Sequence, residues 1–259
     1  MEKLKIKNVT KKNLKDFINL CIPPDKRNNE LFIKGIKTKM KWVNKVIKIY
    51  KNIAKLAYLN SRPVGMIQYL PDPEERIIRI RCIFVPEKQD LRKGIGKSLF
   101  NSLLEDMKKP KSYFGNKPPL ALVVHAFNVP GRYPQSEFFE KMGFKRVKED
   151  EPLLLYYPIK KGFFYTPPHK EYKPCEEDKG KALIFFDPSC PFSIYFSEKI
   201  KEAIKKIVPH IPIRMINEFE ESEEVEKRGK VPVCIVNKKP IISFFLDEEN
   251  FQKEVREAL

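Results

Sequence analysis

The fold of this chain is predicted from two adjoining stretches, Ile83-Phe84-Val85-Pro86 and Leu91-Arg92-Lys93-Gly94-Ile95-Gly96-Lys97. An apolar strand leads into a basic turn that contains two glycines, and a helix begins at once. Glycine lets the backbone turn sharply and expose its N–H groups, and a helix N-terminus adds partial positive charge. Because three cationic side chains stand in or beside the turn, we expect it to bind a phosphate or pyrophosphate group.

Two well-known phosphate motifs do not fit this turn. A P-loop ending in Gly96-Lys97-Ser98 needs a glycine where the chain has Leu91, and a dinucleotide fingerprint starting at Gly94 needs one at Leu99. The turn instead resembles the coenzyme A (CoA) pyrophosphate loop of the GNAT superfamily of N-acetyltransferases. That loop has the pattern Gln/Arg-x-x-Gly-x-Gly/Ala after a strand ending in an apolar residue and proline. The Gln/Arg position is Leu91 in this chain, a departure that removes one side-chain contact.

A second motif of the same superfamily follows in the matching order. An amphipathic helix is predicted from Ile95 to Met107, and a buried strand over 120–124. The run Glu137-Phe138-Phe139-Glu140-Lys141-Met142-Gly143-Phe144 then resembles the Phe-Tyr-Glu-Lys-x-Gly-Phe motif of the fourth GNAT helix. The resemblance implies an α+β GNAT domain with a mixed central sheet over residues 1–160, and acetyl-CoA as its cofactor.

By resemblance, two sets of residues hold the cofactor. The backbone of the central strand contacts the pantetheine arm, through Ile83, Phe84 and Val85. The backbone of the turn holds the pyrophosphate, through Arg92, Lys93, Gly94, Ile95, Gly96 and Lys97.

The resemblance also implies direct acetyl transfer from the thioester to an amine, with a base to deprotonate the amine. His125, late on the strand beside the central one, is a candidate base, because histidine is a residue type that serves as a general base; the alternative is a structural histidine. Phe139 stands where the superfamily carries its tyrosine acid. Tyr133 is therefore the candidate acid, unless it is an ordinary loop tyrosine. Cys82, near the expected reaction centre, is interpreted as a packing residue.

A linker is predicted over 161–180 and a smaller α/β domain over 181–259. A buried strand leads through Cys190-Pro191-Phe192-Ser193 into a helix, and Val231-Pro232 precedes a later strand. This order resembles the thioredoxin superfamily, closest to monothiol glutaredoxins, and implies a cis-proline at Pro232. The two domains together resemble acetyltransferases with a YoaP-like C-terminal domain.

Cys190 is the candidate thiol of the smaller domain, because a helix N-terminus favours the thiolate. Asp187 departs from the lysine of glutaredoxins, which argues against glutathione as a ligand. The alternative function is thus a monothiol oxidoreductase or thiol-binding protein using Cys190, with the first domain as a CoA-binding module. A third interpretation is a domain that only packs on the transferase. Cys234 is predicted to be a buried strand residue, with a disulfide to Cys190 left open.

Composition and charge limit the kinds of site, compartment and binding partner that we expect for this chain. The chain has 259 residues, five irregularly spaced cysteines and three histidines, so we expect no disulfide framework, no metal site and a cytoplasmic location. No apolar run is long enough to span a membrane. The net charge is +17, with 16 Lys/Arg against 4 Asp/Glu in residues 1–60. A solvated lysine-rich face is favoured over a nucleic-acid surface, and we expect a small-molecule or peptide amine acceptor of anionic character.

Overall fold

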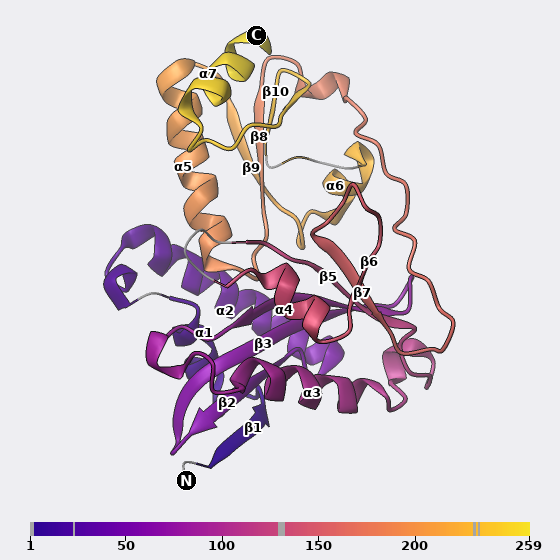
Figure 1. Cartoon of the computed structure of the whole chain (residues 1–259). Coiled ribbons are helices and arrows are strands. Elements are labelled where there is room, and N and C mark those ends of the chain that lie inside the picture. Colours follow the sequence, from indigo (N-terminus) through magenta and orange to yellow (C-terminus); the bar gives the residue numbers. More distant parts are fainter. Residues whose placement is uncertain (1–2, 23, 129–132, 230–231, 233) are drawn as a thin grey trace. The chain divides into compact units, whose positions relative to one another are not determined.

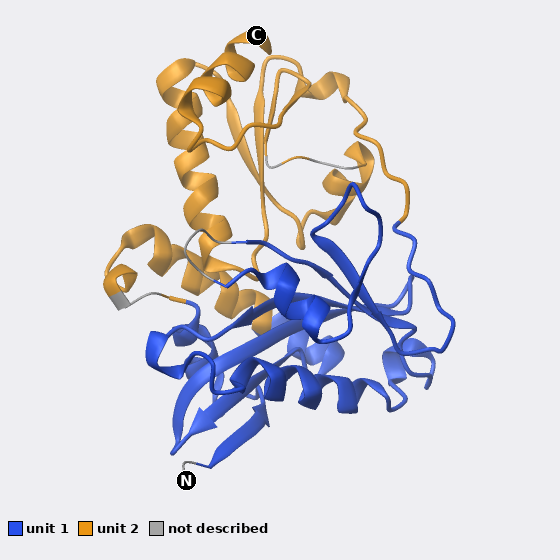
Figure 2. Cartoon of the chain, in the orientation of Figure 1, with its two compact units in different colours: residues 1–21, 44–167 blue, residues 22–43, 168–259 orange. Residues whose placement is uncertain are grey.

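The computed structural model describes residues 3–22, 24–128, 133–229, 232 and 234–259 (Figure 1). The chain forms two compact units, Met1–Cys21 with Asn44–Pro167 (unit 1) and Ile22–Val43 with Pro168–Leu259 (unit 2), which Figure 2 colours separately. The boundaries differ from the expected ones because residues 22–43 are grouped with the second unit. The long helix α2, Glu30–Tyr50, therefore contributes to both units.

Unit 1 is built on a seven-stranded sheet of order β1-β2-β3-β4-β5-β7-β6. Its strands are β1 (Leu4–Asn8), β2 (Ala54–Leu59), β3 (Arg62–Asp72), β4 (Ile77–Phe84), β5 (Ala121–His125), β6 (Lys145–Arg146) and β7 (Leu154–Pro158). Its other helices are α1 (Leu14–Leu20), α3 (Ile95–Met107) and α4 (Gln135–Lys141). β4 and β5 pair in parallel and the other recorded pairs are antiparallel, which confirms the predicted mixed sheet.

Both faces of this sheet are packed against other elements, because successive apolar side chains of a strand point to opposite faces. Ile67 and Tyr69 of β3 belong to the core cluster that the apolar stripe of α3 completes. Met66, the residue before Ile67, lies on the opposite face, where its sulfur is 3.6 Å from the Cys21 sulfur at the end of α1. Leu99 of α3 is fully buried, a burial that contributes about 2 kcal/mol to folding.

Two turns of unit 1 are set by local geometry. The hairpin between β2 and β3 turns on Asn60 and Ser61 alone, with φ of 47° and 70°, and Arg62 already pairs in the strand. Two left-handed residues match the twist of the flanking strands, so the turn needs only two residues. Helix α1 starts at Leu14, and the Asn13 side chain before it accepts a hydrogen bond from the Thr10 backbone and forms a separate turn.

Unit 2 contains a four-stranded sheet of order β11-β10-β8-β9. Its elements are β8 (Ala182–Phe186), α5 (Pro191–Ile207), β9 (Ile213–Asn217), α6 (Ser222–Arg228), β10 (Cys234–Val236), β11 (Lys239–Ile241) and α7 (Glu248–Glu257). β8 and β9 are parallel neighbours joined through α5, while β10 is antiparallel to both β8 and β11. Residues 231 and 233 of the predicted third strand lie outside the described residues.

The N-terminal half of α2 packs tightly on α5 within unit 2. A Cβ at Gly35 would lie 2.8 Å from the carbonyl oxygen of Pro191, so only glycine allows this approach. Phe32 stacks on Tyr195 with ring centroids 4.8 Å apart. Lys34 forms an ion pair with Glu198 of α5. These contacts explain why this half of the helix is grouped with the second unit.

Part of the expected linker is packed rather than extended. Residues 168–180 belong to unit 2, and Asp178 is almost completely buried there. Its carboxylate accepts two hydrogen bonds from the buried Arg228 guanidinium, at 2.7 and 2.6 Å. A bidentate pair of this kind orients both partners, which anchors the segment that the sequence presented as proline-rich and charged.

Candidate active site

The central feature of unit 1 is the separation of β4 from β5. Their parallel pairing runs from Ile77–Ala121 to Ile80–Val124, and in the described residues it ends there although β4 continues to Phe84. A register shift against β3 leaves Arg81 as an extra residue between paired neighbours. Such a bulge bends its strand. The backbone edge of the last residues of β4 is thereby freed from the sheet on the β5 side.

The turn before α3 leaves the first turn of the helix open to an anion. Gly94 is the N-cap residue, has φ of 74°, and has no atom within 4 Å of where a Cβ would stand. Arg92 is also left-handed, with φ of 62°. No side chain among the described residues caps α3, and the first N–H groups of a helix have no partner inside it. These N–H groups and the partial positive charge of a 13-residue helix thus converge at this end.

Gly96 has a different reason to be glycine. Its backbone is helical, and a Cβ there would lie 3.2 Å from the ring of Phe138 on α4. Phe138 in turn contacts Phe139, which is fully buried in the core beside Phe144. The aromatic pair therefore packs α4 against the start of α3, and Phe139 carries no polar atom for proton transfer.

The predicted cations of the turn are not equivalent. Arg92 and Lys97 are exposed, and no described carboxylate pairs with either. The Lys93 ammonium lies 3.4 Å from the carboxylate of Asp90, which also accepts two hydrogen bonds from Arg62 at 2.8 and 3.0 Å. The Asp90 side chain is fully buried, and the hydrogen bonds from Arg62 hold its pKa below the ordinary value. Arg92 and Lys97 are therefore the cations available to a ligand.

Asp90 was not predicted as a site residue. Its only signal in the sequence is a carboxylate placed directly before the basic turn. In the structure it ties the turn to the start of β3, and so it determines where the turn's backbone stands.

Gln135, the first residue of α4, bridges the opening between the two strands. Its side-chain amide donates to the carbonyl of Ile83 on β4 and accepts from the N–H of Phe127 after β5, both at 3.4 Å. One of the backbone groups predicted to contact pantetheine is thus occupied by a side chain in this structure. The bonds are long, which makes Gln135 a displaceable partner.

In the sequence, His125 and Tyr133 lie close to the residues that border this opening, and their side chains make few contacts. His125 is the exposed last residue of β5, paired through its backbone with Leu154 of β7, and its ring has no hydrogen-bond partner among the described residues. Tyr133 is 55% exposed, and the Lys141 ammonium lies 4.9 Å from its ring centroid. A hydrogen bond with Tyr133 raises the pKa of Lys141. Both side chains are accessible to an acceptor.

Cys190 is the N-cap residue of α5 in unit 2 and is partly exposed. Its carbonyl accepts from the Ser193 N–H at 3.1 Å, and its own N–H donates to Asp187. The Asp187 carboxylate is turned to Ser189, accepting from its N–H and its hydroxyl at 2.8 Å each. The expected cis bond of Pro232 joins it to Val231, which lies outside the described residues.

The other thiols differ in accessibility. Cys234 is buried in the core of unit 2, where burial raises its pKa to about 12. Cys234 and Cys190 are both free thiols, so the possible disulfide between them is not formed in this structure. Cys21 is buried, while Cys82 and Cys175 are partly exposed; Cys82 is therefore less buried than predicted.

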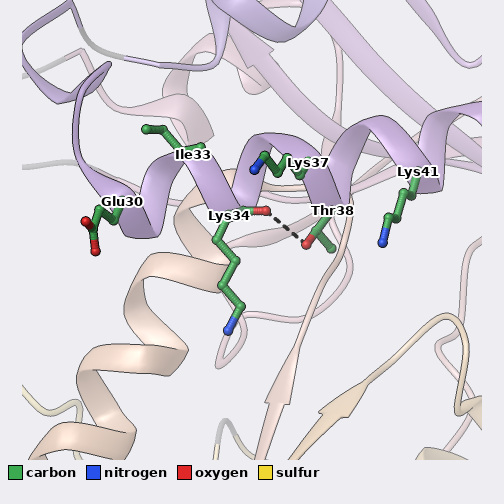
Figure 3. Close-up of a pocket in the computed structure, with 6 residues that line it drawn as sticks. All are labelled: Glu30, Ile33, Lys34, Lys37, Thr38 and Lys41. Atoms are coloured by element: carbon green, nitrogen blue, oxygen red, sulfur yellow. Dashed lines mark hydrogen bonds between the residues drawn. The ribbon is translucent and has the colours of Figure 1, made fainter.

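A basic groove of about 500 Å³ follows the exposed face of α2 in unit 2. Figure 3 shows Lys34, Lys37 and Lys41 along it, with the Thr38 hydroxyl donating to the Lys34 carbonyl at 3.0 Å.

No cluster of three or more His, Cys, Asp or Glu side chains among the described residues could hold a metal ion. None of the described helices is both long and apolar enough to cross a bilayer.

Comparison with known proteins gives structural matches only. No protein-family model matches this sequence, and neither does any curated protein. Among solved structures, a GNAT-family acetyltransferase of Staphylococcus aureus matches with 15% identity, 61% of this chain and 100% of that chain covered, and a TM-score of 0.46.

Two other matches were crystallised with CoA or a CoA-containing analogue. PaiA N-acetyltransferase of Thermoplasma acidophilum, in complex with CoA, has 17% identity, 60% and 99% coverage of the two chains, and a TM-score of 0.43. Naa50 of Arabidopsis thaliana, with a bisubstrate analogue, has 20% identity, 59% and 95% coverage, and a TM-score of 0.37.

Proposed function

We propose that the chain is an acetyl-CoA-dependent N-acetyltransferase whose cofactor is held by unit 1. The observation that carries this proposal is the uncapped N-terminus of α3, preceded by the left-handed Gly94, beside the point where β4 leaves β5. The pyrophosphate would accept hydrogen bonds from the first N–H groups of α3, with Arg92 and Lys97 adding charge. The freed edge of β4 would meet the pantetheine arm, with Gln135 giving up the Ile83 carbonyl.

Bound acetyl-CoA supplies the acetyl group as an activated thioester. The chain's own part is to place the acceptor amine and to move protons. The His125 imidazole would take the proton from the acceptor ammonium, since it is exposed at the end of β5. The Tyr133 hydroxyl would donate a proton to the departing thiolate, in place of the tyrosine that Phe139 replaces.

Binding is tested by thermal shift, because a ligand that binds only the folded state raises the melting temperature with its concentration. We expect acetyl-CoA and CoA to raise it, and pantetheine, which lacks the pyrophosphate, to have much less effect. No shift at millimolar acetyl-CoA would contradict the proposal.

The acceptor is proposed to be an anionic small-molecule or peptide amine, because the chain has a net charge of +17, with 16 Lys/Arg against 4 Asp/Glu in residues 1–60. A surplus of ammonium groups attracts carboxylates and repels polycations. A thiol-release screen over amines, amino acids, aminoglycosides and peptides identifies it. Spermidine as the best acceptor would contradict this part of the proposal alone.

A second candidate function rests on unit 2. Cys190 begins the 17-residue α5 directly after β8, and β8 runs parallel to β9, an arrangement that supports a thioredoxin-like thiol site. We expect Cys190 to react with iodoacetamide at mildly acidic pH faster than Cys175, because the helix N-terminus favours its thiolate. Equal alkylation rates for the two thiols would contradict an activated thiol at Cys190 and would favour a packing role for unit 2.

A further inference from the structure

A second, separate cavity lies in unit 1 where two helices end. It has a volume of about 220 Å³ and is lined by the last residue of α2, Tyr50, by Lys51, by Tyr69 of β3, by Asp106 in the last turn of α3, and by Lys111 and Tyr113 after it. Because α3 rises about 18 Å between its first and last residues, this cavity and the turn at Gly94 are at opposite ends of the same helix.

The Tyr69 hydroxyl is a buried donor without a partner. The side chain is fully buried, and no described group shares a hydrogen bond with its oxygen. Burial raises the pKa of Tyr69, so the hydroxyl keeps its proton. Buried polar groups in folded proteins nearly always have a hydrogen-bond partner. An unpartnered hydroxyl in the wall of a cavity therefore points to an acceptor inside it.

The charges around the cavity are of both signs. Asp106 forms an ion pair with the buried Lys55, which also donates to Asn8 at 2.8 Å. The half-buried Lys111 has no carboxylate within 4 Å among the described residues. Burial lowers the pKa of Lys111, against the opposing effect of Asp106. A half-buried ammonium without a close counter-ion is a second group that favours an acceptor of negative charge.

Neither a simple anion nor a simple amine suits this lining. An anion would meet Asp106 and the carbonyl ends of α2 and α3, where helices carry partial negative charge. An amine would meet the ammonium groups of Lys51 and Lys111. A molecule that carries a carboxylate and an ammonium side by side satisfies both sets of groups.

We infer that this cavity binds a free α-amino acid. Its carboxylate would accept from the Tyr69 hydroxyl and the Lys111 ammonium, and its ammonium would donate to Asp106. The rings of Tyr50 and Tyr113, perpendicular at 88° with centroids 5.4 Å apart, supply aromatic surface for the rest of the molecule. The volume of 220 Å³ limits the ligand to this size, since drug-sized ligands occupy about 300 Å³ or more.

The test is calorimetry and saturation-transfer NMR of the full chain with each of the twenty protein amino acids at up to ten millimolar. We expect at least one to bind, and its decarboxylated amine and its deaminated acid each to bind at least about tenfold more weakly, as expected when a charge-assisted hydrogen bond is lost. No binding by any amino acid, or equal binding by either half-molecule, would overturn the inference.

Matched variants locate the site. We expect Lys111→Met to weaken binding about tenfold and Tyr69→Phe several-fold, while Lys109→Met and Tyr156→Phe, which change a neighbouring lysine and a buried tyrosine outside the cavity, leave it within about twofold. Equal loss in Lys109→Met and Lys111→Met would place any binding elsewhere. Acetyl-CoA affinity, measured on the same samples, reports folding of unit 1, so failure here is distinguishable from failure of the proposed function.

Discussion

At the scale of single residues, the positions of Gly94 and Gly96 favour glycine for different physical reasons. Gly94 needs a left-handed backbone in open space, whereas Gly96 needs room for the Phe138 ring. Glycine is therefore favoured by backbone conformation at position 94 and by side-chain packing at position 96. Substitutions at the two positions can distinguish these two effects.

We predict that Gly94→Val abolishes CoA binding while Gly94→Asn retains most of it. A β-branched residue is strained at positive φ, by about 1–2 kcal/mol, and its side chain would stand over the helix N-terminus, whereas asparagine tolerates this conformation. Isothermal titration with CoA measures the difference. Normal affinity in Gly94→Val would show that the turn is only structural.

Asp90 gives a prediction on stability and pH. Asp90→Asn removes a buried carboxylate that holds Arg62 and Lys93, and we expect a loss of about 2 kcal/mol at pH 7. Since the folded-state pKa is lowered from 3.8, the wild-type advantage is complete well above that value and disappears as the pH falls below it. Urea unfolding at pH 7 and pH 3 measures this. A difference that persists unchanged at pH 3 would exclude the ionised carboxylate as its cause.

At the scale of elements, α2 shows how packing overrides helix propensity. Gly35→Ala in an exposed helix interior would stabilise by about 1 kcal/mol. Here the new Cβ would stand 2.8 Å from the Pro191 carbonyl oxygen, so we expect net destabilisation of about 1–3 kcal/mol. Lys37→Ala, on the exposed face of the same helix, is the control and should be nearly neutral. Thermal unfolding compares them, and a stabilised Gly35→Ala would contradict the close contact.

The anchoring of α6 gives a second prediction at this scale. Arg228→Met leaves the Asp178 carboxylate buried without its partner, and we expect a loss of about 3–5 kcal/mol. Asp178→Leu combined with Arg228→Met removes both charges and should recover much of that loss. Denaturant unfolding of the wild type and the two variants tests this. A double variant as unstable as the single one would show that shape rather than charge is at issue.

At the scale of the whole molecule, the chain passes from unit 1 into unit 2 and back, so a fragment cut after unit 1 contains a segment that has lost its packing partners. A fragment of residues 1–167 contains Ile22–Val43 but lacks α5 and the other contacts of that segment in unit 2. We expect limited proteolysis of the fragment to cleave within 22–43, where the full chain resists. Equal resistance of both would show that this segment is held by unit 1 alone.

Local patterns in the sequence determined much of this protein. The alternation of the strands, the apolar stripe of α3, the glycine turn before it and the helix that follows Cys190 are properties of neighbouring residues, so they could be predicted within a residue or two. The short α6 was not predicted, since its seven residues carry no apolar stripe. Candidate site residues that belong to the backbone of such elements, such as Gly94 and Ile83, were accessible to the same reasoning.

Only the tertiary structure decided which distant residues meet. The pairing of Asp90 with Arg62, the bridge from Gln135 to Ile83 and the contact of Gly35 with Pro191 join positions 28, 52 and 156 residues apart. No periodicity records such contacts, because they depend on how whole elements pack and not on the order of residues within one. For the same reason, neither the grouping of residues 22–43 with the second unit nor the cavity at Tyr69 could be predicted from the sequence.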